Sequence, residues 1–205
     1  MKPPIQVRYF LFADVKEYSR IPDTGMPEFA SRFLGGVSAL FSDSQKGLTP
    51  AIYANTWGDA IFLVFETAGA AGRAGLEIRD WLEREPFQLS GMTAPLSLRI
   101  GMHAGPAYLA EDAIAGRPLF LGSHINRAAR IEPITEQGQI FVSREFAALA
   151  ALENVTDFRC VPQGIADLPK GAGRIPVYRL ERSSPPGGFP DRLENPVNSV
   201  TAGSE

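Results

Sequence analysis

The stretch Tyr53-Ala-Asn-Thr-Trp-Gly-Asp-Ala-Ile-Phe-Leu-Val-Phe65 contains two apolar runs that meet at a tight turn, and the tip of that turn carries the carboxylate of Asp59. Its pattern predicts a pair of antiparallel strands. A second carboxylate, Asp14, ends the apolar run that begins at Tyr9. Two strand ends that are distant in sequence can meet in space, and Mg²⁺ binds one or two carboxylates together with substrate phosphates. The pattern therefore indicates phosphate chemistry.

The composition is that of one globular domain, because 205 residues with 44% hydrophobic side chains can bury a core of their own. A net charge of -3 gives no basic field that would attract nucleic acid or a membrane surface. The single cysteine, Cys160, excludes an internal disulfide and is expected to serve as packing material. The chain lacks the apolar segment of a signal peptide and any run of roughly 18 apolar residues, so we expect a soluble cytoplasmic protein.

The hydrophobic periodicity predicts an α+β fold, in which helices pack on a largely antiparallel sheet. The first half has the order of a ferredoxin-like βαββαβ unit. We expect residues 1–182 to form one domain and the Pro/Gly/Ser-rich residues 183–205 to form a tail. Strands are predicted at 5–13, 51–57, 60–66, 95–102, 105–110, 139–142, 156–161 and 175–180, and helices at 26–42, 68–84, 123–132 and from Ser143 to about 152.

Six short motifs, each weak by itself, occur in a fixed order. They are Phe12-Ala13-Asp14-Val15, Gly58-Asp59-Ala60-Ile61, Arg99-Ile-Gly-Met-His103-Ala-Gly105, Gly122-Ser-His-Ile-Asn126-Arg-Ala-Ala-Arg130-Ile-Glu132, Gly138-Gln-Ile-Phe-Val-Ser143, and Lys170-Gly171 ahead of Val177-Tyr178. In order and spacing the set resembles the catalytic domain of class III nucleotidyl cyclases, over residues 5 to 182. That family makes cyclic nucleotides from nucleoside triphosphates and works as a head-to-tail dimer with shared sites. No receptor, membrane or sensor region is expected beside it.

The resemblance implies two Mg²⁺ or Mn²⁺ ions as cofactors. Asp14 and Asp59 would be their ligands, and the backbone at Val15 would belong to the same site. The backbone from Val15 to Tyr18 would open a helix that faces the phosphates. Arg99 would reach the phosphates from its strand.

The remaining catalytic groups would come from the other chain of a homodimer. By the resemblance, Asn126 would position the ribose and Arg130 would stabilise charge on the transferred phosphoryl group. These two residues are four apart, so they share one helix face. Lys170 would contact the triphosphate tail, although the segment after it is about one residue shorter than the family pattern.

The base pocket departs from the purine-specific members of the family. Those carry one selecting residue three before the glycine of the Gly-Asp pair and another three before the glycine that opens the Asn/Arg helix. Adenylate cyclases have Lys and then usually Asp, Thr or Ser, whereas this chain has Asn55 and Leu119. The Glu that specifies guanine is also absent. Leu119 cannot accept a hydrogen bond from the adenine amino group, and a missing partner at a buried polar contact is costly.

A pyrimidine fits the remaining groups better. Tyr53, Asn55 and Trp57 alternate on one strand and share a face. The amide of Asn55 matches the O4/N3–H edge of uracil or, after rotation, the N3/amino edge of cytosine. Bulky Tyr53 and Leu119 would narrow the pocket to one ring. The chain is similar to the stand-alone pyrimidine cyclases of bacterial antiviral defence, whose cyclic UMP or cyclic CMP activates a separate effector; UTP is the substrate we expect.

Several of these residues also have purely structural interpretations. Asp14 and Asp59 could be turn residues, Arg99 a strand residue whose stem packs on apolar surface, and Asn126 and Arg130 a solvated helix face. Asn55 could be a polar strand end. Tyr53 and Trp57 could be core or dimer-interface aromatics. His103 and His124 are expected to be structural. The functional alternatives are an adenylate cyclase with an unusual pocket and an inactive, cyclase-like nucleotide-binding module.

Overall fold

The computed structural model describes residues 4–89, 92 and 94–183. Its strands form a single sheet in the order β2-β3-β1-β4-β6-β8-β7, and β5 pairs with β4 beside this path. The strands are β1 (Ile5–Val15), β2 (Tyr53–Trp57), β3 (Ala60–Phe65), β4 (Leu98–Asp112), β5 (Arg117–Leu121), β6 (Ile140–Ser143), β7 (Phe158–Asp167) and β8 (Arg174–Arg182). The main helices are α1 (Met26–Glu28), α2 (Gly35–Ser42), α3 (Ala68–Arg84), α4 (Ser123–Ile131) and α5 (Arg144–Leu152).

The predicted α+β class is confirmed, and the first half has the ferredoxin-like arrangement. Strands β2, β3, β1 and β4 lie side by side and are antiparallel throughout. The pairing of β4 with β6 is parallel. The helix predicted at 26–42 forms as α1, a π-helical turn over Phe29–Leu34, and α2 in direct succession. Of the predicted tail 183–205, only Ser183 falls within the residues that the structure describes.

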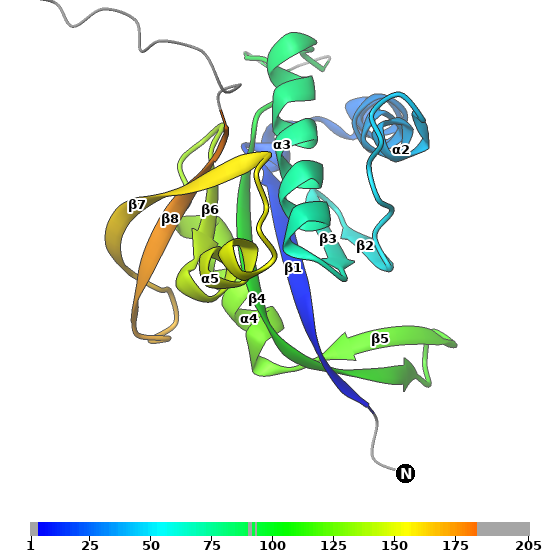
Figure 1. The fold of residues 1–205 in the computed structure, drawn as a ribbon. Coiled ribbons are helices and arrows are strands. Elements are labelled where there is room, and N and C mark those ends of the chain that lie inside the picture. The colour runs from blue at the N-terminus through cyan, green and yellow to red at the C-terminus, as the bar shows by residue number, and fades with distance from the viewer. Residues whose placement is uncertain (1–3, 90–91, 93, 184–205) are drawn as a thin grey trace, which may run out of the picture.

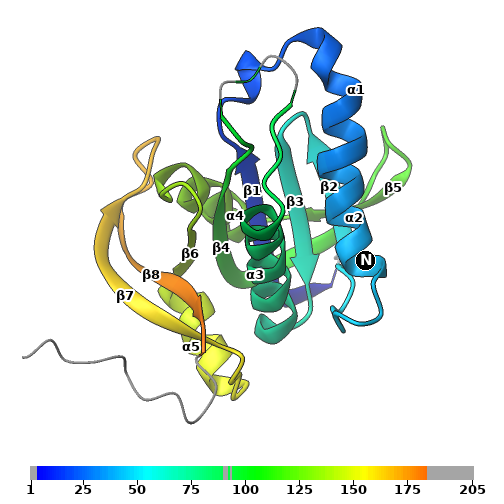
Figure 2. The same ribbon diagram turned by 90° about the horizontal axis from the view of Figure 1, so that it is seen from above.

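The two faces of the sheet have separate cores. Helices α2 and α3 run along one face (Figures 1 and 2), where side chains such as Leu11, Phe33 and Leu76 form the larger buried cluster. The other face carries a smaller cluster around Phe10 and Phe120, to which α4 contributes Ala128. Alternation along β1 places Leu11 on the helix-covered face and the side chain of Asp14 on the opposite face. The candidate site therefore lies on the face away from α2 and α3.

Helix α3 matches its predicted range of 68–84, and its glycines serve close packing. A Cβ at Gly72 would come within 2.2 Å of the Phe158 ring, and a Cβ at Gly75 within 2.2 Å of Met102. The side-chain oxygen of Thr67 accepts a hydrogen bond from the Ala70 N–H at the start of the helix. The absence of side chains lets the helix approach the sheet, which offsets the low helix propensity of glycine.

The strand pair predicted around Gly105 is wrong. Gly105 lies inside one long strand, β4, where a Cβ would come within 2.3 Å of the His124 ring. The chain turns at residues 113–116 instead, and β5 returns as the partner of β4. Asp112 accepts hydrogen bonds from the N–H groups of Ile114 and Ala115, and Gly116 has a φ of 62°. The sequence analysis predicts neither this turn nor β5.

The histidines have the structural surroundings that the sequence predicted. His103 is fully buried, with Nδ1 at 2.7 Å from Ser143 Oγ and Nε2 at 2.8 Å from His124 Nδ1. Ser143 also caps α5, as predicted, by accepting a hydrogen bond from the Phe146 N–H. Cys160 packs half-buried against the main core, and burial raises the pKa of its thiol to about 11. None of the helices in the described residues is long and apolar enough to cross a membrane.

Candidate active site

Two carboxylates meet where β1 ends and the β2–β3 turn begins. Asp14 lies opposite Ala60 in the β1–β3 register, so Asp59, the residue before Ala60, is its neighbour. Gly58 supplies the positive φ of 61° that this turn requires. Burial raises the pKa of Asp14, and the negative charge of Asp59 raises it further. Repulsion between these carboxylates is the electrostatic condition that a bound cation would relieve.

Arg99 lies directly beside this pair. It faces Asp14 in the β1–β4 register, and its Nη2 donates a hydrogen bond to Asp14 Oδ2 at 3.0 Å. Its Nε donates to Glu132. Burial lowers the pKa of Arg99, but the hydrogen bond and charge of Glu132, together with Asp14, raise it more, so the net pKa shift is upward. The guanidinium is thus fixed at the edge of the acidic pair.

Glu132 is a site residue to which the sequence reasoning gave no role. It follows α4 and opens the short 3₁₀ helix Glu132–Ile134. A Cβ at Gly101 would come within 2.2 Å of the Glu132 backbone nitrogen, so the glycine lets this turn sit against β4. Burial raises the pKa of Glu132, Arg99 lowers it, and Asp14 raises it. Glu132 is part of the Arg130-Ile-Glu132 motif, but the sequence does not show that it lies beside Arg99; that contact depends on the fold.

The acidic pair fits a cation that the substrate helps to hold. Across residues 4–89, 92 and 94–183, no group of three or more His, Cys, Asp or Glu side chains could hold a metal ion by itself. Carboxylates nevertheless outnumber the single guanidinium of Arg99 around Asp14. Mg²⁺ sites with one or two carboxylates take the rest of their ligands from water and phosphate oxygens. Asp14 and Asp59 match that kind of site.

The backbone after Asp14 differs from the expected helix start. Strand β1 continues through Val15, whose side chain is buried, and a 3₁₀ turn over Tyr18–Arg20 follows. The residue before that turn, Glu17, has a left-handed backbone with a φ of 62°. A helical turn thus begins at the end of the predicted range, at Tyr18, but it is a 3₁₀ turn of three residues, and its contact with phosphates stays a prediction.

The three residues predicted to face a base lie on β2 with different surroundings. The Tyr53 ring packs edge-on against Phe120, with the ring centres 5.8 Å apart. The side-chain oxygen of Asn55 accepts a hydrogen bond from Arg117 Nη2 at 2.9 Å. Trp57 is 85% exposed, so within this chain it is not a core residue. Leu119 is half-buried on β5, two residues after Arg117.

Asn126 and Arg130 lie on α4, whose Ala128 packs on the same sheet face as Phe10. Asn126 is exposed and Arg130 half-buried. Within the described part of the chain, neither forms a hydrogen bond or ion pair with Asp14 or Asp59. The structure therefore does not bring the two halves of the predicted site together through direct contacts within one chain. Lys170 is exposed in the β7–β8 turn, with a φ of 58°.

The chain matches a known protein family over most of its length. The model of the adenylate and guanylate cyclase catalytic domain matches residues 9–182. The chain belongs to this family. The matched residues include Asp14, Asp59 and Arg99, so the acidic pair and its arginine are part of a nucleotide cyclase domain.

Individual relatives of this cyclase domain are distant. The adenylyl cyclase CyaB from P. aeruginosa superposes with a TM-score of 0.71 at 19% identity, covering 90% of this chain and 98% of that one. The guanylate cyclase domain of RhGC from Catenaria anguillulae, solved with GTP, gives a TM-score of 0.68 at 21% identity, covering 87% and 98%. A curated relative, the serine/threonine-protein kinase pkn2 of Myxococcus xanthus, is 25% identical over 140 residues, which are 66% of this chain but only 15% of that protein.

Proposed function

We propose that this cyclase domain converts UTP to cyclic UMP and pyrophosphate. The observation that carries the proposal is the pair Asp14 and Asp59, held beside Arg99 at one end of the sheet. Family membership supports the reaction type. The replacement of both purine selectors by Asn55 and Leu119 supports a pyrimidine substrate. The relatives named above are described as adenylyl and guanylate cyclases, so the pyrimidine preference rests on this chain's own residues.

The reaction forms one bond and breaks one bond. The ribose 3′ oxygen attacks the α-phosphorus, the bond from that phosphorus to the β-phosphate oxygen breaks, pyrophosphate leaves, and the 3′-hydroxyl proton passes to solvent. Asp14 and Asp59 would hold two Mg²⁺ or Mn²⁺ ions, which lower the pKa of the attacking hydroxyl and neutralise phosphate charge. Positioning and electrostatic stabilisation supply most of the catalysis in phosphoryl transfer.

Arg99 and Glu132 prepare the acidic pair for this task. The bond from Arg99 to Asp14 partly offsets the repulsion of Asp59, which holds the Asp14 carboxylate in place before substrate arrives. Arg99 uses Nε and Nη2 for carboxylates, and its Nη1 has no hydrogen-bond partner among the described residues. That free edge of the guanidinium is the part that would reach a phosphate. A charge-assisted bond of this kind is about twice as strong as a neutral one.

The second half of the site comes from another copy of the chain in this proposal. Asn126 would position the ribose, and Arg130 would stabilise charge on the α-phosphoryl group. The lack of direct bonds between these residues and the acidic pair in one chain supports the arrangement. A guanylyl cyclase domain of similar fold from Blastocladiella emersonii is described as a non-canonical dimer in one solved structure and as a monomer in another. Lys170 would contact the triphosphate tail of the same substrate.

The base would lie against β2 and β5. Tyr53 and Phe120 pack together there, and Leu119 adds bulk without a polar atom. A purine needs more space and, for adenine, an acceptor for its amino group, which Leu119 lacks. By its similarity to the pyrimidine cyclases, the product would be a messenger of antiviral defence, read by a separate effector.

The test is incubation of the purified protein with ATP, GTP, CTP and UTP, each with Mn²⁺, followed by chromatography and mass analysis of the products. We expect cyclic UMP as the main product. Cyclic AMP as the main product would support the cyclase activity and contradict the proposed pyrimidine pocket. No product from any triphosphate, with no metal-dependent nucleotide binding, would reject the enzyme and favour an inactive, cyclase-like module.

A further inference from the structure

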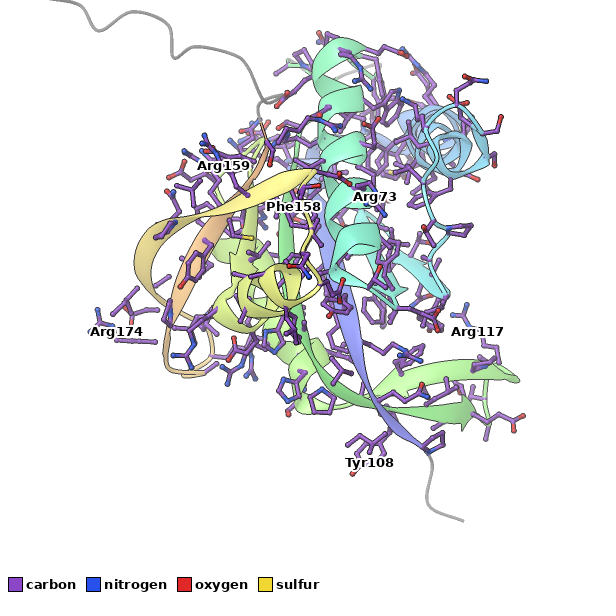
Figure 3. All side chains as sticks on the ribbon, in the orientation of Figure 1. Arg73, Tyr108, Arg117, Phe158, Arg159 and Arg174 are labelled. Carbon is purple, nitrogen blue, oxygen red and sulfur yellow. The ribbon has the colours of Figure 1, made fainter. Side chains whose placement is uncertain are left out.

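Arg117 is in contact with the residue that we expect to read the base. It is the first residue of β5 and lies 62 positions from Asn55 in sequence, yet its Nη2 donates to Asn55 Oδ1 at 2.9 Å. In Figure 3 its side chain rises from β5 toward β2. Asp112 lies opposite Arg117 in the β4–β5 register, but its carboxylate accepts the backbone N–H groups of Ile114 and Ala115. No carboxylate in the described residues forms an ion pair with Arg117.

The packing around the pair keeps the two strands together. Tyr53 and Phe120 lie two and three residues from Asn55 and Arg117, and their rings meet edge-on at 78° with centres 5.8 Å apart. Arg117 and Leu119 are two apart on β5, so their side chains leave the same face of the strand. The contact thus joins the strand of one selector position, Asn55 on β2, to the strand of the other, Leu119 on β5.

The contact decides which way the Asn55 amide points. A guanidinium has five N–H donors and no acceptor, so the atom of Asn55 that faces it must be the oxygen. The amide nitrogen is then directed away from Arg117. Rotating the amide by half a turn would place two donors against each other and remove a hydrogen bond to a charged group.

The two pyrimidines differ in the orientation that they need. Uracil offers O4 as an acceptor and N3–H as a donor, whereas cytosine offers its amino group as a donor and N3 as an acceptor. An amide that pairs with one must rotate to pair with the other. We propose that Arg117 is a positioning residue: it occupies the Asn55 oxygen and leaves the amide nitrogen, a donor, to face the base, which suits the O4 acceptor of uracil and disfavours the amino group of cytosine. This inference rests on the proposed pyrimidine cyclase activity and resolves the choice that Asn55 alone leaves open.

Two substitutions of Arg117 by long side chains distinguish its effect on the orientation of the Asn55 amide from the space that its side chain fills. Lys also only donates, so Arg117→Lys should keep the amide orientation. Gln can donate or accept, so Arg117→Gln should let the amide rotate. The measurement is the ratio of cyclic UMP to cyclic CMP formed from an equimolar mixture of UTP and CTP, which does not depend on the amount of active enzyme. We expect the ratio to fall by roughly tenfold or more in Arg117→Gln, as befits loss of a hydrogen bond to a charged group, and to stay near the parent value in Arg117→Lys.

Asn55→Asp changes the group that faces the base, from an amide that can donate a hydrogen bond to a carboxylate that can only accept one. Its carboxylate would pair with Arg117 and offer only acceptors to the base, so the ratio should move toward cyclic CMP. An unchanged ratio in Arg117→Gln, or equal ratios in the Gln and Lys variants, would overturn the role of Arg117 while leaving the activity intact. If the parent protein makes only purine products, the proposed function itself fails. If it makes none, the ratio of the dissociation constants for UTP and CTP with Mn²⁺ tests Arg117 by the same criterion.

Discussion

At the scale of single residues, Asp59 offers the sharpest test of the proposed metal site. It lies half-exposed in a turn, so Asp59→Asn should fold normally while losing the charge that a cation needs. Loss of groups that merely support a metal ligand commonly costs 10–100-fold, so loss of a ligand should cost roughly 100-fold or more in turnover. Steady-state rates at several Mn²⁺ concentrations measure this. Asp23→Asn, at an exposed aspartate in the 3₁₀ turn Asp23–Gly25, is the matched control and should keep full activity.

His103 should make folding stability dependent on pH. Burial lowers its pKa from 6.5 to about 4, while Glu145 raises it and His124 and Arg127 lower it. As the pH falls through 6.5 the unfolded chain takes up a proton that the folded chain refuses, so the stability is complete above 6.5 and is lost toward about 4. We expect the unfolding free energy to fall by about 2 kcal/mol between pH 7 and pH 5. Urea unfolding at both pH values measures the drop, and an equal drop in His103→Gln would assign it to other groups.

At the scale of elements, the glycines of α3 and α2 predict opposite effects of one substitution. Gly72→Ala would place a Cβ 2.2 Å from the Phe158 ring, which is only 5% exposed and cannot move away easily. We expect a loss of about 1–3 kcal/mol from overpacking. Gly35 has helical dihedral angles, and a Cβ there would find only Ala30 O at 3.8 Å. Gly35→Ala should therefore stabilise by about 0.4–1 kcal/mol. Thermal melting of both variants tests the pair, and a stabilised Gly72→Ala would contradict the packing argument.

The elements also show how far sequence reasoning reached and where it stopped. Helix α3 and the β2–β3 turn follow from local periodicity and turn residues, and both were predicted at nearly their observed bounds. The sequence does not predict the β4–β5 hairpin, because Gly105 has the local pattern of a turn, whereas in the structure this glycine makes room for the His124 ring of α4. Such a contact has no local signature. For the same reason the bonds from Arg99 to Glu132 and from Arg117 to Asn55 became visible only in three dimensions.

At the scale of the whole molecule, the proposed dimer with shared sites predicts that two inactive variants can restore each other, because no direct bond joins Arg130 to the acidic pair within the described residues of one chain. In the proposed homodimer, Asp59→Asn would remove the metal half of both sites and Arg130→Ala would remove the other half. A mixed dimer contains one site with Asp59 from one chain and Arg130 from the other. If subunits mix freely, half of the dimers are mixed and each has one intact site, so activity should return to about a quarter of the parent value at equal concentrations. Titrating one inactive variant into the other measures this recovery. Two Asp59-defective variants, such as Asp59→Asn with Asp59→Ala, should give none, and the absence of recovery in the first mixture would place the complete site within a single chain.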